Sequence, residues 1–164
     1  MRERDFDRLY SEHAQGLFAF LAYRTGDRAL AEDLVADAFE RVLTARRGFD
    51  RRRGTVKTWL YAIALNLLRD HLRRMGAEQR ALERSVAAVA AGGGRERDAF
   101  ALVEHRDELA AALAKLTGEE REAVALRFGG DLTVPEIAEL TGEKLTTVEG
   151  RVYRALGKLR DELC

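Results

Sequence analysis

The sequence has little of what β-sheet proteins and disulfide-stabilised secreted proteins need. It holds one proline in 164 residues and few β-branched residues, whereas alanine, leucine, arginine and glutamate are abundant. This composition predicts an all-helical fold. The single cysteine, Cys164, cannot form an intrachain disulfide, and the three scattered histidines have no metal-binding spacing. We therefore expect no metal and no cofactor.

Long hydrophobic runs are also lacking. No stretch of 18 residues is free of charge, which argues against a transmembrane helix. The first residues, MRERDFDRLYSEH, are charged where a signal peptide would need an apolar core. We expect a cytoplasmic protein with no membrane insertion.

The net charge is zero, but the charges are unevenly distributed. Residues 1–40 carry 5 Lys/Arg and 9 Asp/Glu, residues 41–80 carry 11 and 3, and residues 105–144 carry 5 and 9. Polyanions respond to local fields within a Debye length of about 8 Å at physiological salt. A basic block between acidic flanks therefore indicates two kinds of partner.

Hydrophobic periodicity predicts helices over residues 5–24, 28–46 and 55–80, with Asp27 and Thr55 as N-caps of the second and third. Residues 85–98 lose this periodicity and contain small residues followed by three glycines, as a flexible tether does. Further helices are predicted over 99–115, 119–128, 133–140 and 146–162. The fold class is thus all-α, with a three-helix domain (1–80), a flexible linker (81–104) and a second small helical domain (105–164).

The strongest motif is TVPEIAELTGEKLTTVEGRVYRALGKLR, residues 133–160, which has the pattern of a helix-turn-helix. Ala138 is small enough for the two helices to cross closely, and Gly142 lies at the turn, where a positive φ favours glycine. Six residues are predicted to face inward: Ile137, Ala138, Val148, Val152, Ala155 and Leu159.

The other face of the second helix predicts a DNA-binding surface. Small residues beside long cations let a helix backbone approach the major groove while Arg and Lys reach bases and phosphates. Cations on an exposed helix are usually only solvated, but the glycine turn and the close crossing favour DNA binding. Glu149 lies off the cationic stripe, where it could pair with a neighbouring cation. The candidate residues are Thr146, Thr147, Arg151, Arg154 and Lys158, with Gly150 and Gly157 beside them.

A second basic surface is predicted on TVKTWLYAIALNLLRDHLRR, residues 55–74, and the loop before it. Cations hold phosphates, while Asn and aromatic side chains can hydrogen-bond to or stack on the bases of a separated strand. Trp59 is either such a contact or, as we favour, a core residue. The candidates are Arg52, Arg53, Lys57, Asn66, Arg69, Arg73 and Arg74.

The patterns AEDLVADAFERVL, TWLYAIALNLLRDHLRR and LTGEEREAVALRFGGDLTVPEIAELTGEKLTTVEGRVYRAL occur in the order typical of the extracytoplasmic-function (ECF) sigma factors, which the chain resembles. The resemblance implies a sigma-2 domain (1–80) that opens the −10 element and a sigma-4 domain (105–164) that reads the −35 element. Where that family usually has T-V-K-S-R, this chain has Thr147–Val148–Glu149–Gly150–Arg151.

The same resemblance implies the partners. By itself the polar face of residues 28–46 needs no function beyond solvation, but in the family it binds the coiled coil of the polymerase β′ subunit. The apolar side of the sigma-4 domain would dock on the β flap, and an anti-sigma factor would mask these faces. The residues implied for core polymerase are Asp33, Ala36, Asp37, Glu40 and Arg41.

Two other functional classes are weighed against this interpretation. A stand-alone helix-turn-helix regulator would bind duplex DNA unaided, usually as a symmetric dimer. An enzyme is not expected, because no nucleophile–base pair, metal constellation or phosphate-binding loop is visible in the sequence.

Overall fold

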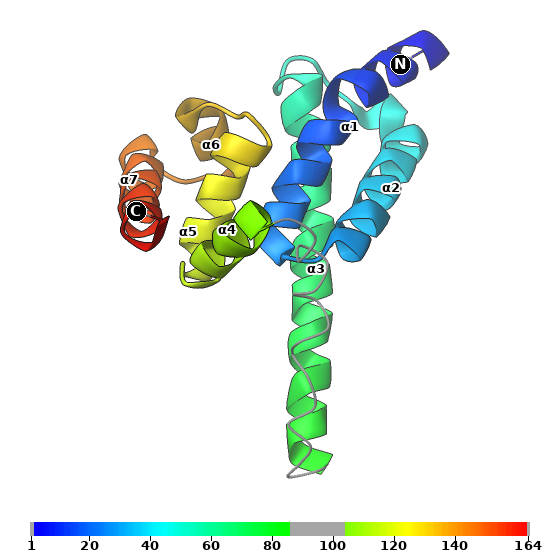
Figure 1. The fold of residues 1–164 in the computed structure, drawn as a ribbon. Coiled ribbons are helices and arrows are strands. Elements are labelled where there is room, and N and C mark those ends of the chain that lie inside the picture. The colour runs from blue at the N-terminus through cyan, green and yellow to red at the C-terminus, as the bar shows by residue number, and fades with distance from the viewer. Residues whose placement is uncertain (1, 86–103, 164) are drawn as a thin grey trace.

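The computed structural model of the chain describes residues 2–85 and 104–163, and the side chains of residues 2–76 and 108–163. All regular secondary structure within these ranges is helical (Figure 1). An N-terminal unit contains α1 (Glu3–Thr25), α2 (Arg28–Ala45), a short 3-10 helix (Arg46–Gly48) and α3 (Val56–Ser85). A C-terminal unit contains α4 (Glu104–Ala114), α5 (Gly118–Val124), a π-helical segment (Ala125–Gly129), α6 (Val134–Thr141) and α7 (Leu145–Leu163). The all-helical, two-part architecture is confirmed.

Local capping chemistry sets the helix boundaries in the N-terminal unit. Gly26 ends α1 in the left-handed conformation (φ 71°), and the Asp27 carboxylate accepts a hydrogen bond from the Leu30 amide at 3.1 Å. Thr55 Oγ1 accepts from the Thr58 amide at 3.2 Å at the start of α3. Both predicted N-caps therefore satisfy amides that a helix leaves unpaired at its first turn.

Reciprocal capping boxes start α5 and α6 in the C-terminal unit. Thr117 Oγ1 accepts from the Glu120 amide at 3.1 Å, and Glu120 accepts from the Thr117 amide at 3.0 Å. Thr133 and Glu136 form the same pair at 3.2 and 2.9 Å. Gly142 ends α6 with φ 71°, the positive value predicted for the helix-turn-helix turn.

Two helix predictions need correction. The third helix continues to Ser85, five residues into the predicted linker, because the segment AEQRALERS is rich in good helix formers. The rest of that linker, and the start of the helix predicted over 99–115, lie outside the described residues. The helix predicted over 119–128 changes at Ala125 to π-helical geometry, in which the Gly130 amide donates to the Ala125 carbonyl at 2.9 Å.

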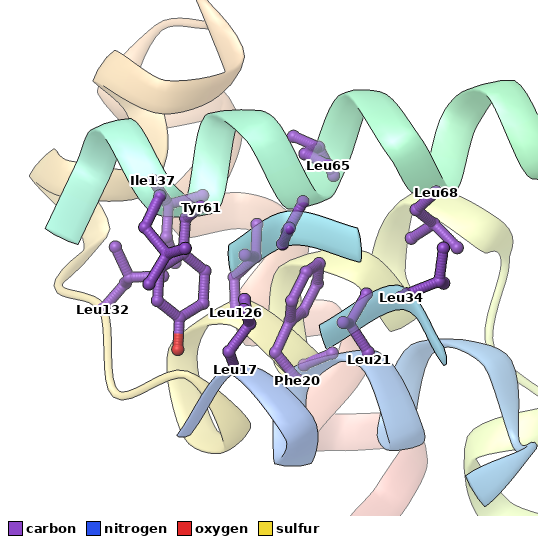
Figure 2. Close-up of a cluster of buried hydrophobic side chains, with 14 of the residues drawn as sticks. Leu17, Phe20, Leu21, Leu34, Tyr61, Leu65, Leu68, Leu126, Leu132 and Ile137 are labelled. Carbon is purple, nitrogen blue, oxygen red and sulfur yellow. The ribbon is translucent and has the colours of Figure 1, made fainter. Parts of the chain in front are cut away.

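One hydrophobic core runs through both units (Figure 2). The α3 helix is buried on a wider face than the stripe that helical periodicity alone indicates, which holds Val56, Leu60, Ile63, Leu67 and Leu68. Of that stripe only Leu60 and Leu68 are buried, whereas Tyr61, Ala64 and Leu65 beside it are buried as well. The reason is that α3 contacts α1 and α2 of its own unit and also α6 of the other. The core joins Leu17, Phe20 and Leu21 of α1 to Leu126, Leu132 and Ile137 of the C-terminal unit.

Candidate nucleic-acid interface

The helix-turn-helix formed by α6 and α7 buries the predicted inward face. All six residues predicted to face inward are buried: Ile137, Ala138, Val148, Val152, Ala155 and Leu159. With this face fixed, the opposite side of α7 is presented to solvent. Thr146, Thr147 and Arg154 are exposed there. The fold therefore supplies an accessible helix of the kind that enters a major groove.

Arg151 differs from its neighbours on this face because it is held by carboxylates. Its side chain is 17% exposed, and its guanidinium lies 2.6 Å from Glu143 Oε1 and 3.5 Å from Glu119 Oε2. The hydrogen bond from Arg151 lowers the pKa of Glu143 below its usual value. Arg151 thus ties the turn before α7 to the start of α5.

Lys158 is also engaged. Its Nζ donates to Glu120 Oε1 at 2.7 Å, and this contact is the main cause that lowers the pKa of Glu120. Glu120 is buried and belongs to the capping box of α5, so the pair links α7 to α5. Within residues 108–163, Arg154 is the predicted DNA-binding cation that forms no ion pair.

The two departures from the family pattern have different structural settings. A Cβ at Gly150 would lie 3.1 Å from Arg154 Nη1, so the absence of a side chain leaves room for the arginine to lie along the helix. Glu149 is exposed and, among the described residues, forms no ion pair, so the pairing considered for it is not present.

Tyr153, which sequence patterns did not single out, is 80% exposed beside Arg154. The sequence could have indicated this exposure, because Tyr153 lies outside the inward-facing stripe of α7.

The second basic surface lies on α3 and the loop before it. Its two central arginines are exposed: Arg69 lies 3.5 Å from Glu122 Oε2 of α5, and Arg73 pairs with Asp70. Lys57 donates to the Asp131 carbonyl at 3.1 Å. Asn66, Arg69 and Arg73 are exposed at positions i, i+3 and i+7 of α3, which places them on one side of the helix. Four more candidates are nearby in sequence: Arg52, Arg53, Lys57 and Arg74.

Trp59 is half-buried and packs against the core. Its ring centroid lies 5.0 Å from that of Phe49, with the planes inclined by 41°. This aromatic pair connects the basic loop to α3, which favours the structural role expected for the tryptophan.

The polar face of α2 is open. Asp33, Ala36, Asp37, Glu40 and Arg41 are all exposed, and none of the four charged residues forms an ion pair within the part of the chain whose side chains are described. None of the helices described here is long and apolar enough to span a bilayer.

Comparison with known proteins places both units in one family. Residues 9–78 match the family described as Sigma-70 region 2, and residues 106–159 match Sigma-70, region 4. The ECF RNA polymerase sigma factor BldN of Streptomyces coelicolor is 35% identical over 68 residues, which are 42% of this chain and 26% of that protein. The ECF sigma factor SigX of Bacillus subtilis is 36% identical over 72 residues, 44% of this chain and 37% of that protein. This chain belongs to the ECF sigma factors.

The sigma factor matches less than half of the length of these curated relatives. Its fold is shared over nearly the whole chain with solved structures. RpoE of Bartonella quintana, solved with the anti-sigma factor NepR, has a TM-score of 0.78 at 23% identity, covering 98% of this chain and 97% of that one. CnrH, solved with the cytosolic domain of CnrY, has a TM-score of 0.73 at 26% identity, covering 99% and 89%. Sigma factors are transcription initiation factors, so the family confirms that the chain is not an enzyme.

Proposed function

We propose that this sigma factor binds core RNA polymerase and directs it to promoters, with residues 105–164 reading the −35 element and residues 1–80 opening the −10 element. The observation that carries the proposal is α7, which is anchored on one side by buried residues and exposes Thr146, Thr147 and Arg154 on the other. A second, separate basic surface lies on α3.

At the −35 element, α7 enters the major groove. Arg154 is the cation free to reach a base edge, and Tyr153 beside it offers a ring for contact with a thymine methyl group. Arg151 and Lys158 contact DNA only if they exchange their glutamate partners for phosphate or base. Their present role is to hold α7 against α5.

At the −10 element, the exposed cations of α3 and its preceding loop hold the phosphate backbone. Asn66 lies on the same side as Arg69 and Arg73 and can hydrogen-bond to a base that has left the stack. Capture of such bases converts binding energy into strand separation. The phosphate contacts of this surface are Arg52, Arg53, Lys57 and Arg74.

Core polymerase makes the two weak DNA contacts effective together. The open face of α2 (Asp33, Ala36, Asp37, Glu40 and Arg41) binds the β′ coiled coil, and the apolar side of the C-terminal unit docks on the β flap. With both units fixed by the enzyme, the second DNA contact occurs at high effective concentration. The chain acts in the cytoplasm, where polymerase and promoters are.

Run-off transcription with core polymerase tests the −10 assignment. We expect the Arg69→Ala/Arg73→Ala variant to lose about tenfold or more of its initiation, since each lost contact costs about 1–3 kcal/mol. The control is Arg4→Ala/Arg8→Ala, which removes two exposed cations from α1 and should initiate normally. Normal initiation by the Arg69→Ala/Arg73→Ala variant would contradict the assignment of α3 to the −10 element.

A gel shift with and without core polymerase tests the whole proposal. A sigma factor shifts promoter DNA strongly only with the polymerase present, whereas a stand-alone dimeric regulator would shift duplex DNA alone. Sequencing the transcripts that the chain initiates with core polymerase would supply the promoter for both assays.

An anti-sigma factor is the partner proposed for regulation. Support comes from RpoE and CnrH, which were solved with NepR and with the cytosolic domain of CnrY. Such a protein would mask the polymerase-binding faces, and co-purification with the intact chain would identify it.

A further inference from the structure

Gly150 lies inside α7, where its own backbone does not require a glycine. Glycine is a poor residue for a helix interior, because it loses more backbone freedom on folding than alanine does. Its φ is not positive, so alanine would suit the same backbone. The reason for a glycine at this position therefore lies in what surrounds it.

The charged end of Arg154 lies directly over Gly150. A Cβ added to the glycine would lie 3.1 Å from Arg154 Nη1 and 3.9 Å from both Cζ and Nη2. All three atoms belong to the guanidinium. Long side chains of a helix lean toward its N-terminus, which is why residue 154 covers the turn that contains residue 150. A side chain at Gly150 would occupy part of this space, and Arg154 would have to move.

The cations on either side of Arg154 hold α7 in place. Arg151 Nη1 donates to Glu143 Oε1 at 2.6 Å, and Lys158 Nζ donates to Glu120 Oε1 at 2.7 Å. Arg154 forms no ion pair within residues 108–163. Its direction is therefore set by its neighbours on the helix and not by a carboxylate of another element.

Gly150 also lies on the side of α7 that faces away from the core. Successive helix residues are about 100° apart, which puts Gly150 roughly opposite the buried residues Val148, Val152 and Ala155. A helix that enters a major groove with its exposed side brings such a position close to the base edges. A guanidinium that lies over Gly150 is then held between the helix and the bases.

We propose that Gly150 is a positioning residue of the −35 contact, which acts through Arg154 by admitting its guanidinium to the helix surface and so directing it to a guanine. The inference rests on the proposed function of α7. A guanidinium donates to O6 and N7 of guanine together, and this two-point contact depends on direction as well as on charge. A Cβ at residue 150 would displace the guanidinium by a few tenths of an ångström, which weakens the two-point contact and leaves the charge in place.

The test is initiation by core polymerase and the intact chain from promoters with a randomised −35 segment, built on a promoter found by sequencing its transcripts. We expect the parent chain to prefer guanine at one base pair. Arg154→Ala should reduce that preference about fivefold or more. Gly150→Ala should reduce it several-fold at the same pair and leave the other pairs unaffected. Arg154→Lys should behave like Arg154→Ala, because lysine is a point charge without a two-point donor set.

The double variant Gly150→Ala/Arg154→Ala shows whether the glycine acts through the arginine. It should have the base preference of Arg154→Ala alone, because the two substitutions remove the same contact. Gly157→Ala is the matched control. It makes the same change inside α7, where an added Cβ meets nothing within 4 Å, and it should keep the preference of the parent chain.

Thermal unfolding separates positioning from a structural role. Gly150→Ala should be at least as stable as the parent chain, because alanine is the better helix former and the crowded atoms are the end of a flexible side chain. A lower Tm, together with an equal loss of initiation at every −35 segment, would overturn the proposal in favour of a structural role.

Two other results would also overturn it. One is an unchanged base preference in Gly150→Ala. The other is a further change of preference when Gly150→Ala is added to Arg154→Ala, because the methyl group would then act on the DNA directly. Failure of the proposed function gives a different result, in which the parent chain initiates equally from every −35 segment.

Discussion

Arg151 and Arg154 lie about one turn apart on α7, yet their alanine variants should affect different properties of the protein. Arg151 is 17% exposed and is bound by Glu143 at 2.6 Å and Glu119 at 3.5 Å. Arg154 is exposed and forms no ion pair within the described part of the chain. We therefore expect Arg151→Ala to lower stability and Arg154→Ala to lower DNA affinity.

The stability loss follows from the burial of the partners. A hydrogen bond to a charged group contributes about 1.5–3 kcal/mol when buried, and an exposed ion pair about 0–1 kcal/mol. Glu143 is 29% exposed and Glu119 is 77% exposed, so the contact with Glu143 dominates. The expected cost of Arg151→Ala is roughly 1–2 kcal/mol of unfolding free energy. For a chain of this size that corresponds to a fall in Tm of about 2–8 °C.

Arg154→Ala should leave Tm nearly unchanged, since exposed substitutions usually stay within about 0.5 kcal/mol. If Arg154 binds a base, its loss costs about 1–3 kcal/mol of affinity, or roughly 5- to 150-fold in Kd. Both variants would be measured by thermal unfolding and by anisotropy of polymerase-bound chain on a duplex carrying the −35 segment. Glu143→Gln serves as the control and should repeat the stability loss of Arg151→Ala.

Equal decreases in Tm for Arg151→Ala and Arg154→Ala would refute the assignment of a stabilising role to Arg151 and a DNA-binding role to Arg154. So would full stability in Arg151→Ala, because the glutamate contacts would then contribute nothing. A normal Kd for Arg154→Ala, with reduced affinity for Arg151→Ala at unchanged Tm, would mean that Arg151 leaves its glutamates to bind DNA.

Three further outcomes are expected. The hydrogen bond from Arg151 lowers the pKa of Glu143, so the stabilisation from this pair is present above about pH 4.3, the pKa of an unfolded glutamate, and is lost as the pH falls through the lower folded pKa. Tm should therefore decrease when the pH is lowered below about 4.5, and it should decrease less in Glu143→Gln. Thr133→Ala should cost about 1 kcal/mol by removing the cap of α6, whereas Thr133→Ser should retain it in a urea titration. Replacing Arg51–Arg53 by alanine should weaken DNA binding of the polymerase-bound chain across sequences and flatten its dependence on log salt by about 0.9 per lost phosphate contact.

Features decided by nearby residues were predictable from the sequence. Asp27 and Thr55 cap helices, as predicted, because their side chains reach amides three positions away. Gly142 adopts the left-handed conformation that its turn requires. The inward stripe of α7 follows from helical periodicity, which is a property of the segment itself.

Features that depend on distant residues were not predictable in this way. Tyr61 can be buried because Gly130 lies 69 positions later in the sequence but next to it in the fold. The Gly130 carbonyl accepts a hydrogen bond from the Tyr61 hydroxyl at 3.4 Å, and the absence of a side chain at Gly130 leaves space for the ring. Arg151 belongs to the predicted DNA stripe by periodicity, but Glu119 lies on another helix that no periodicity relates to it. The sequence therefore predicts where the cationic surfaces lie, but it does not indicate which of their cations are already paired within the chain.

The unevenly distributed charges meet where the two units touch. The basic segment 41–80 and the acidic segment 105–144 are joined there by the ion pair between Arg69 and Glu122, 3.5 Å apart. A carboxylate held at this distance competes with DNA phosphate for the same cation, while charges more than about 8 Å apart are largely screened at physiological salt. Pairing of this kind lowers the local positive potential of the basic segment without changing the total charge. Zero net charge is therefore compatible with a DNA-binding chain, because the total conceals a local basic surface whose cations are partly paired within the chain.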